Sequence, residues 1–347
     1  MTEKEIQIYT SGKENPNAYD FSKKEPVKLK TIIKRLHIRK KYIVYFFIII
    51  FLMAVLGSLL LFNVFTVGEL YCFLGLSNGI EKKDTDFAIY YLDVGQSDCS
   101  IILCEDSVMM IDSATINNKN KIDNTLMALD IKEIDYLVIT HQHDDHIGNA
   151  ESIIKKYSVK NIIMPAIDEN HDFDLDSYQS LLNTIAKKGV NPISSSDYDS
   201  FMLGSAKINI LSPNKYFEDL NDMSIVLKVE YGDNSFLFQG DAGKEVEQHL
   251  INEGVDLSAD VIKIGHHGSN TASTDEYLSC VNPSACIIPY GSRNNFNHPN
   301  PKVIDRLEER NIDIYLTLYH GNLTLTSDGN TITIYPQKNE ETKTYNS

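Results

Sequence analysis

The stretch "ITHQHDDHIGN", residues 139–149, places three histidines and two aspartates in six consecutive positions, directly after an apolar run. Neutral imidazoles and carboxylates are the ligands that zinc and other first-row divalent cations take in proteins. His141 and His143 are two residues apart, so in an extended loop both side chains can point toward one ion. Asp145 and His146 follow about one turn later and can reach a second ion. Because packing rarely requires so many such groups together, the loop predicts a metal site.

A further carboxylate of this kind is Asp241, in "FQGDA", at the end of a strand-like run. An anionic oxygen at a strand end can lie between two dications, which makes Asp241 a candidate bridging ligand. Its alternative role is to cap the helical stretch "GKEVEQHL" that follows it.

A histidine pair, His266 and His267, follows the strand-like run "DVIKIG". We expect His266 to be a metal ligand and His267 to be a second ligand or a partner of a phosphoryl oxygen, although these roles could be exchanged. The Gly-Ser after the pair, which includes Ser269, offers backbone N–H groups to an anion. His298, flanked by Asn and Pro, either contacts substrate or shapes a loop. Asn294, in the same segment, is a further candidate substrate contact.

The elements that would position these side chains alternate between short apolar strands and helical patterns from residue 86 onward. The strand "DYLVIT" ends just before His141, and the helical stretch "HIGNAESIIKKY" begins directly after the cluster. Groups at the carboxyl end of a strand are held by a rigid scaffold and remain reachable. The pattern predicts one α/β domain over residues 86–337, closed by a hairpin pair with an Asp-Gly turn.

The cluster resembles the metallo-β-lactamase superfamily, whose HxHxDH motif is matched by His141, His143, Asp145 and His146. This resemblance implies an α/β fold of the αββα sandwich type with bound divalent metal. Within the superfamily, residues 86–335 are similar to the branch that contains the soluble domain of the competence protein ComEC.

Other motifs carry the resemblance to that branch. "DVGQSD", Asp93–Asp98, resembles its DVGQGD motif, with Ser97 in place of a glycine. Asp112 in "MMIDSA" matches the structural aspartate behind the site, and Asp241 matches the aspartate that bridges two ions. "KIGHHGS" resembles the HHGS motif, and "YGSRNNFNHPNP" resembles a G-x-N-N-x-x-G-H-P segment, with Asn297 where glycine is usual.

One position departs from the superfamily pattern. A histidine ligand of the first metal usually precedes the strand that corresponds to "SIVLKVEYG", and here that place reads "DLNDMS". Asn221 or Asp222 could bind there directly or through water, and relatives in this branch also carry Asn. We therefore expect a divalent metal, zinc or manganese, at two ions per chain, with the choice between one ion and two left open by the first site.

Hydrolysis is the reaction that this ligand set favours. Two ions a few ångströms apart would lower the pKa of a bridging water to about 7. Asp145 would orient the hydroxide and take its proton, and His267 would stabilise charge on a substrate oxygen. The sequence contains no Ser-His-Asp elbow, P-loop or dinucleotide fingerprint. We therefore expect a metal-dependent hydrolase with Asp145 and His267 as its catalytic residues.

Charge restricts the substrate. Residues 1–41 hold 11 Lys and Arg against 5 Asp and Glu, whereas the other 306 residues hold 21 against 43, a net charge of −22. Such an acidic domain disfavours tight, nonspecific binding of long polyanions, nucleic acids included. The resemblance implies phosphodiester cleavage, with DNA or a cell-wall polymer as substrate.

Three other functions stay open. The resemblance also extends to cell-surface phosphorylcholine esterases that act on teichoic acid, and acidic surroundings with 19 tyrosines would suit a quaternary ammonium group. A β-lactam or lactone hydrolase would use the same site, but the HHGS and DVGQ-type motifs favour the phosphodiesterase branch. The third alternative, suggested by the unusual first metal site, is a binding or sensing module with weakened catalysis.

An apolar segment near the N-terminus, residues 43–67, has 25 residues without a charge, enough to cross a bilayer as one helix. The basic stretch "KRLHIRKK" precedes it and orients the N-terminus toward the cytoplasm. We therefore expect a single-pass protein of the cell membrane with an extracellular catalytic domain. Its predicted parts are a basic, partly disordered cytoplasmic tail (1–41), a transmembrane helix (42–67), a linker (68–85), the hydrolase domain (86–337) and a polar tail (338–347).

The five cysteines are odd in number and show no CxxC spacing. This pattern indicates neither a disulfide framework nor a cysteine zinc site. Cys99, Cys104 and Cys286 lie in apolar runs and are expected to be buried thiols, with a single disulfide pair as the alternative.

Overall fold

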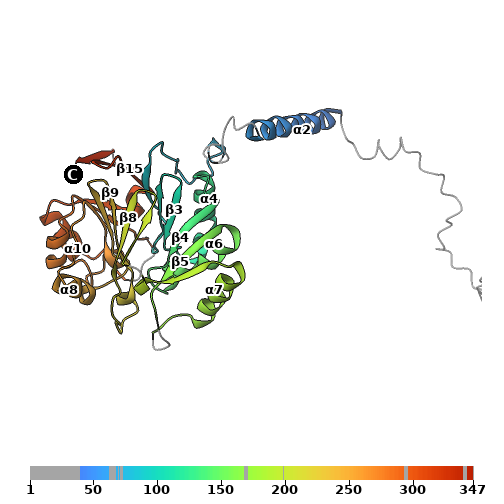
Figure 1. The fold of residues 1–347 in the computed structure, drawn as a ribbon. Helices are drawn as coiled ribbons and strands as arrows, with labels where there is room; N and C mark the ends of the chain where they lie inside the picture. The colour runs from blue at the N-terminus through green and yellow to red at the C-terminus, as the bar shows by residue number, and fades with distance from the viewer. Residues whose placement is uncertain are drawn as a thin grey trace, which may run out of the picture. The chain divides into compact units, whose positions relative to one another are not determined.

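A computed structural model describes residues 40–61, 68, 70, 73–167, 171–197, 199–292, 296–338 and 342–346 (Figure 1). The chain divides into two compact units, Met1–Val64 and Phe65–Ser347. The predicted cytoplasmic tail, residues 1–41, lies almost wholly outside the described residues.

In the first unit the described element is helix α2, Lys40–Leu61. Its large apolar side chains from Tyr42 to Val55 are mostly exposed. Among the residues that the structure describes, no helix combines the length and the apolar character that a membrane crossing requires. The predicted transmembrane helix is therefore not confirmed, and its last residues, 62–67, lie outside the described part of the chain.

Two β-sheets form the framework of the second unit (Figure 1). The larger has the strand order β16-β15-β14-β1-β2-β3-β4-β5-β6, and the smaller has the order β13-β12-β11-β10-β9-β8-β7. The strands are β1 (Phe87–Tyr91), β2 (Ser100–Cys104), β3 (Ser107–Ile111), β4 (Glu133–Val138), β5 (Ser158–Met164), β6 (Asn191–Ser194), β7 (Ser200–Leu203), β8 (Ala206–Ser212), β9 (Val226–Tyr231), β10 (Asn234–Phe238), β11 (Val261–Lys263), β12 (Ala285–Ile288), β13 (Asp313–Leu316), β14 (Leu323–Ser327), β15 (Thr331–Pro336) and β16 (Lys343–Asn346).

Helices cover the outer face of each sheet (Figure 1). The larger sheet carries α4 (Lys119–Ala128), α6 (Ala150–Lys156) and α7 (Leu175–Lys188), and the smaller carries α8 (Lys244–Asn252), α9 (Asp275–Val281) and α10 (Pro301–Glu309). The short helices are α5 (Asp144–Ile147), α11 (Thr317–His320) and the 3-10 turns η2 (Ile116–Asn118), η3 (Ser195–Asp197), η4 (Asn221–Met223) and η5 (Gly265–Gly268). The predicted αββα sandwich is confirmed.

Alternation along the strands explains the layers. In β1, Phe87, Ile89 and Tyr91 face the apolar layer between the two sheets, whereas Ala88 and Tyr90 face the layer under the helices. Successive side chains of a strand point to opposite faces, so a strand buried on both sides is apolar throughout. Strand β1 is accordingly buried at all five positions.

Parallel pairing brings the polar loops to the same edge of each sheet. β3, β4 and β5 pair in parallel in the larger sheet, and β10, β11 and β12 pair in parallel in the smaller one. The loops after β4, β10 and β11 hold the histidines and aspartates predicted to bind metal. Parallel strands place their carboxyl ends together, so residues far apart in sequence meet there.

Two segments outside the predicted domain pack onto it. In the expected linker, Ile80 is buried in the core under the helices, and the backbone carbonyl of Asn78 accepts hydrogen bonds from Asn322 and Gln337. In the expected polar tail, β16 pairs with β15 and extends the larger sheet. Among the described cysteines, Cys99, Cys104 and Cys286 are buried, and these three and Cys280 are free thiols.

Candidate metal centre

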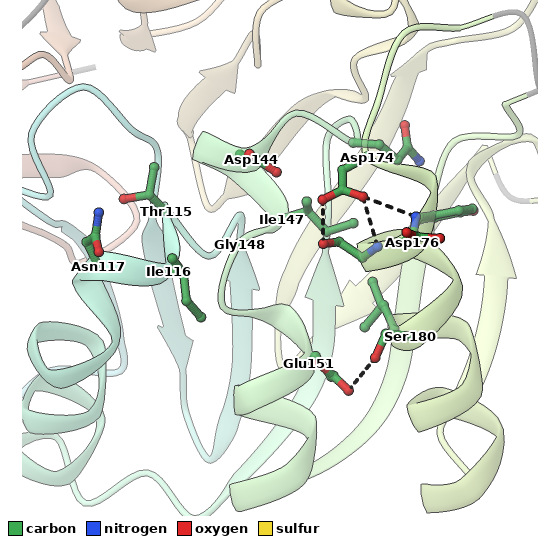
Figure 2. A pocket seen from close by; sticks show the side chains of 14 residues that line it. Thr115, Ile116, Asn117, Asp144, Ile147, Gly148, Glu151, Asp174, Asp176 and Ser180 are labelled. Carbon is green, nitrogen blue, oxygen red and sulfur yellow. Dashed lines mark hydrogen bonds between the residues drawn. The ribbon is translucent and has the colours of Figure 1, made fainter.

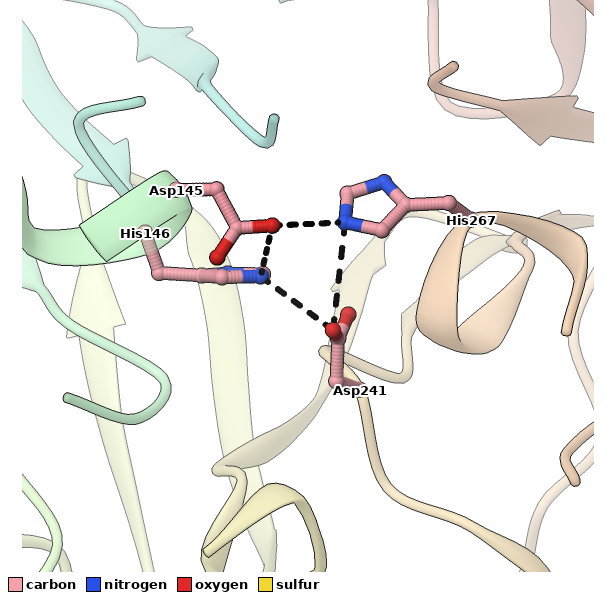
Figure 3. Close-up of side chains that lie close together, drawn as sticks. All are labelled: Asp145, His146, Asp241 and His267. Carbon is pink, nitrogen blue, oxygen red and sulfur yellow. Dashed lines mark hydrogen bonds and ion pairs between the residues drawn. The ribbon is translucent and has the colours of Figure 1, made fainter. Parts of the chain in front are cut away.

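Four side chains from three loops converge at the edge where the two sheets meet (Figure 3). Asp145 and His146 lie on α5, directly after the β4 loop, while Asp241 follows β10 and His267 lies in η5 after β11. One ligand atom of each lies within 4.8 Å of the others. The Oδ2 atom of Asp241 is 3.4 Å from His146 Nε2 and 3.8 Å from His267 Nε2. The Oδ2 atom of Asp145 is 3.2 Å from His267 Nε2.

The free atoms of this cluster fit a divalent cation. His146 Nε2 and Asp241 Oδ1 are buried and have no hydrogen-bond partner among the described residues. Buried polar atoms are normally satisfied, and an unsatisfied lone pair at a functional site indicates an ion or a water. Two imidazole nitrogens and two carboxylates are a donor set that zinc and manganese accept.

His146 is oriented from behind by Asp112. Its Nδ1 atom lies 2.8 Å from Asp112 Oδ2, and both side chains are fully buried. Thr140 donates its backbone N–H to Asp112 Oδ1 and its hydroxyl to Asp112 Oδ2, each at 2.8 Å. A carboxylate that accepts the Nδ1–H of a histidine leaves Nε2 as the ligand atom. This is the role implied for Asp112 by the family resemblance.

His141 and His143 form a second pair of donors beside the cluster. His141 Nε2 and His143 Nδ1 lie 3.0 Å apart. The rings of His141 and His146 have centroids 4.1 Å apart, so the pair adjoins the four-residue cluster. The hydroxyls of Thr140 and Ser224 lie 3.2 and 3.3 Å from His141 Nδ1. These positions fit the predicted first metal site.

The structure distinguishes the two candidates for the remaining position of that first site. Asn221, in η4, lines the same cavity as the cluster, and its Oδ1 atom is buried without a hydrogen-bond partner among the described residues. Asp222 instead accepts a hydrogen bond of 2.7 Å from the backbone N–H of Gly243. Asn221 is therefore the residue available to a ligand, while Asp222 holds the start of α8.

The two adjacent histidines differ in their surroundings. The His267 side chain is 2% exposed; its Nδ1–H donates to the carbonyl of Pro289 at 2.9 Å, and its Nε2 belongs to the cluster. The His266 side chain is 27% exposed and lines the cavity, with Nε2 3.7 Å from Asp241 Oδ2. Both residues have positive φ, 48° for His266 and 52° for His267, a strained conformation that clusters at functional sites.

A cavity of about 700 Å³ opens onto the cluster. Ser269 and His298, both predicted substrate contacts, line it together with Phe296 and Gln96. The third predicted contact, Asn294, lies outside the described residues. Burial and the neighbouring His266 and His267 lower the pKa of His298 to about 4, so its ring is neutral at pH 7.

An adjoining cavity of about 620 Å³ shares the lining residues Gln142, Asp144 and Asp174 with the first (Figure 2). Glu151 and Asp176 add two more acidic side chains to its wall. The described residues that line it include no Lys or Arg. The surroundings of the metal centre are therefore acidic.

In the absence of metal, the histidines and carboxylates of the cluster stabilise each other's charged forms. Burial opposes the charged form of His146, but the carboxylates of Asp241, Asp112 and Asp145 raise its pKa well above the ordinary value. Burial likewise opposes ionisation of Asp241, yet His146 and His267 hold its pKa well below the usual range. Burial lowers the pKa of His141, so this ring is neutral.

Sequence reasoning missed the charged pair beneath the cluster. Lys263 in β11 and Asp98 are each 2% exposed, and Lys263 Nζ forms an ion pair with Asp98 Oδ2. Asp98 ends the motif "DVGQSD", but the motif alone assigns it no role. The signal for the pair is Lys263 itself, a charged residue inside the apolar run "DVIKIG" that precedes His266.

Glu247 in α8 is a second missed residue. It is 1% exposed and accepts hydrogen bonds from the backbone N–H groups of Ser273 and Thr274 and from the side chain of Gln239. Burial raises its pKa. These bonds fix the loop that begins with the two histidines.

Comparison with known proteins agrees with the fold described above. Residues 92–291 match the family model of the metallo-beta-lactamase superfamily. The chain is 31% identical over 216 residues to ComE operon protein 3 of Bacillus subtilis, and this match covers 61% of this chain and 27% of that protein. It is 26% identical over 246 residues to competence protein ComA of Neisseria gonorrhoeae, and that match covers 69% of this chain and 32% of ComA.

A solved structure of a CmlA beta-hydroxylase mutant is similar at a TM-score of 0.49 and 14% identity, over 71% of this chain and 55% of that one. The chain spans about a third or less of the length of the two curated relatives.

Proposed function

This chain belongs to the metallo-beta-lactamase superfamily, and on that premise we propose that it is a metal-dependent hydrolase of phosphodiesters. One observation carries the proposal: Asp145, His146, Asp241 and His267 converge on a common point, where His146 Nε2 and Asp241 Oδ1 are buried and make no hydrogen bond with the described residues. In the proposed centre these four residues would hold one divalent cation. His141, His143 and Asn221 would hold a second, with Asp241 available as a ligand to either.

Divalent cations bound in this way supply Lewis acidity and a water of lowered pKa. Asp145 lies at the cavity wall, with its side chain 29% exposed. Burial opposes its ionisation, but His146 and His267 lower its pKa, so it is a carboxylate at neutral pH. It therefore accepts a hydrogen bond from the attacking water and orients it toward the phosphorus.

His266 is the proposed partner of the phosphoryl oxygens, and His267 the proposed ligand. This assignment exchanges the two roles expected first, because His267 Nε2 belongs to the buried cluster while His266 faces the cavity. The rings of His266 and His298 have centroids 5.5 Å apart, so both can contact one substrate. A donor beside the non-bridging oxygens stabilises the charge that develops on them.

Two features bear on the substrate, namely the relatives of this chain and the charge around its cavities. The name of one curated relative refers to competence, which supports DNA as a substrate, with a cell-wall polymer as the alternative phosphodiester. The acidic residues around the two cavities oppose a long polyanion such as duplex DNA. A short or single-stranded phosphodiester fits this environment better.

A second candidate function is the hydrolysis of a phosphodiester with a cationic group, such as a phosphorylcholine ester of teichoic acid. The adjoining cavity favours it, because Asp144, Glu151, Asp174 and Asp176 line that cavity beside the apolar side chain of Leu181. An ammonium group there would gain Coulombic attraction that a nucleotide would not. A binding module without catalysis is the third candidate, and the retained Asp145 at the cavity wall argues against it.

The test uses the purified full-length protein with bis(p-nitrophenyl) phosphate, plasmid DNA, single-stranded DNA and p-nitrophenylphosphorylcholine, each with and without zinc or manganese. Metal-dependent release of p-nitrophenol from the first compound supports the phosphodiesterase. Preference for the choline ester over DNA would favour the second candidate. Absence of turnover with every compound and metal would overturn the proposed activity.

Location is a separate proposal that rests on the sequence. The charge-free residues 43–67 after a basic stretch would place the hydrolase domain outside the cell if they form a span. Protease treatment of intact cells tests this directly: loss of the domain supports an extracellular position, and protection until lysis contradicts it.

A further inference from the structure

Lys263 is a fully buried lysine at the end of β11, immediately beneath the metal centre. Its Nζ atom forms an ion pair with Asp98 Oδ2 and lies 3.4 Å from the carbonyl oxygen of Gly240. Buried lysines are rare because removal of an ammonium from water costs several kcal/mol.

Asp98 connects this lysine to the cluster. Its Oδ2 atom lies 3.9 Å from His146 Nδ1, and its Oδ1 atom lies 3.8 Å from His267 Nδ1, so its charge acts on the two rings without a hydrogen bond to either. Its backbone N–H donates to the carbonyl of Asp145 at 3.1 Å. Asp98 therefore adjoins three of the four cluster residues, on the side of the two rings that faces away from the common point.

Lys263 also reaches Asp241, the fourth residue of the cluster, through the backbone. The carbonyl of Gly240, which Lys263 approaches, precedes Asp241 and also accepts the backbone N–H of His266 at 3.1 Å. The loop from the larger sheet, which carries Asp98, and the loops of the smaller sheet thus meet at one ammonium group.

The charge of Lys263 is needed for a second reason. Asp98, Asp112 and His146 are spaced so that one atom of each lies within 4.8 Å of the others, which is itself a geometry that a cation could occupy. Two buried carboxylates so close together repel each other unless a positive charge lies nearby. The ammonium group lies against Asp98 and supplies that charge from the protein itself.

We propose that Lys263 is a positioning residue of the metal centre. Its ammonium group holds Asp98, whose charge faces the Nδ1 sides of His146 and His267, and approaches the Gly240 carbonyl that precedes Asp241, so that the ligands from the two sheets stay at one point. The proposal rests on the metal-dependent function proposed above. Residues that orient metal ligands from behind change metal affinity 10- to 100-fold when they are replaced. Lys263 and Asp98 are expected to belong to that class although neither would touch the metal.

The test compares Lys263→Met with Lys263→Arg in the full-length protein. The matched control is Lys228→Met, because Lys228 is also a buried lysine of the smaller sheet, 4% exposed, and pairs with Asp256 at 2.7 Å. The readouts are zinc affinity by competition with a chromophoric chelator and the visible absorption spectrum of the cobalt-loaded protein, which reports ligand geometry. Thermal unfolding without metal shows which variants fold.

Lys263→Met is expected to bind zinc 10- to 100-fold more weakly and to change the cobalt spectrum, and Lys263→Arg is expected to recover most of both. Lys228→Met is expected to unfold at a lower temperature while its zinc affinity stays within twofold of the wild type. Equal zinc affinity and an unchanged cobalt spectrum in Lys263→Met would overturn the proposal. An equal loss of affinity in Lys228→Met would do the same, because the effect would then be structural.

Asp98→Asn covers the case in which Lys263→Met does not fold. This variant keeps the size of the side chain and removes the charge that links the lysine to the two rings, and a loss of zinc affinity of the same order is expected. Unchanged affinity in a folded Asp98→Asn protein would contradict the inference. Failure of the wild type to bind zinc, cobalt or manganese would instead reject the metal-dependent function, and this inference with it.

Discussion

His146 and Asp112 form a buried pair, with Nδ1 and Oδ2 2.8 Å apart, although 33 residues separate them in the sequence. The pair fixes which nitrogen of His146 faces the cluster. Because Thr140 donates to both oxygens of Asp112, the carboxylate itself is held in place. The orientation of the ligand is thus built into the fold before any metal binds.

Asp112→Asn tests this pair. An amide in place of the carboxylate removes the anionic acceptor of the Nδ1–H of His146, so metal affinity should fall 10- to 100-fold. Chelator competition measures the change. The control is Asp135→Asn, because Asp135 likewise accepts a buried backbone N–H, that of Val108 at 2.8 Å, on the larger sheet. Equal affinity in the wild type and Asp112→Asn would show that the pair has no effect on the ligand.

The two adjacent histidines should separate binding from turnover. His267→Ala removes a buried atom of the cluster, so the protein should lose one equivalent of metal and its phosphodiesterase activity. His266→Ala should keep its metal and lose about 100-fold in kcat, which is the size of effect when one oxyanion donor is removed. Elemental analysis and steady-state kinetics on both variants decide this. The reverse pattern would restore the first assignment, with His266 as the ligand.

Metal loading should release protons at pH 7. The pKa of His146 and that of His267 are raised in the metal-free protein, because nearby carboxylates outweigh the effect of burial. Both rings therefore keep their extra proton at pH values above 6.5, the ordinary pKa of histidine. Metal requires the neutral ring, so affinity should rise as pH rises toward those pKa values and fall as pH drops. His141, whose pKa is lowered, should contribute no proton.

Calorimetry of zinc binding in buffers of different ionisation enthalpy counts these protons. At least one proton released per chain at pH 7 is expected. Enthalpies that do not depend on the buffer at pH 7 would contradict the assignment of charge to His146 and His267.

Gly240 should be irreplaceable for a steric reason. Its φ is 58°, and a Cβ atom there would lie 2.9 Å from Cβ of Ser224 and 3.2 Å from Cβ of Thr140. Backbone strain and overpacking together should make Gly240→Ala less stable by about 2–4 kcal/mol. Gly254→Ala is the control, since its φ is 68° and none of the described atoms lies within 4 Å of an added Cβ. Denaturant unfolding should give a loss of about 1–2 kcal/mol there, and equal losses in both variants would reject the steric account.

Much of the fold could be predicted because its signals are local. The strand before His141 and the alternation of strands and helices from residue 86 indicated an α/β domain, and the αββα sandwich and the similarity to ComEC-like competence proteins are confirmed. The strand β16 was missed, because its polar residues lie at a sheet edge and carry no apolar pattern. The role of Ile80 was missed because one apolar residue in a polar segment carries no period.

The sequence allowed the types of residue in the candidate site to be predicted, but not their positions relative to one another in space. Spacing brought His141, His143, Asp145 and His146 together, because they lie within six consecutive residues. The choice between His266 and His267 depends on two positive φ angles, which sequence does not indicate for histidine. The pair of Lys263 and Asp98 spans 165 residues and exists only because the two sheets pack face to face.

The central claim is that the four converging side chains bind metal, and the most direct test is the metal content of the purified full-length protein and of its Asp241→Ala variant. Elemental analysis after dialysis should find one to two equivalents of zinc or manganese in the wild type and at least one equivalent fewer in a folded Asp241→Ala protein. Less than a tenth of an equivalent in the wild type after metal loading, or equal content in both proteins, would contradict the account.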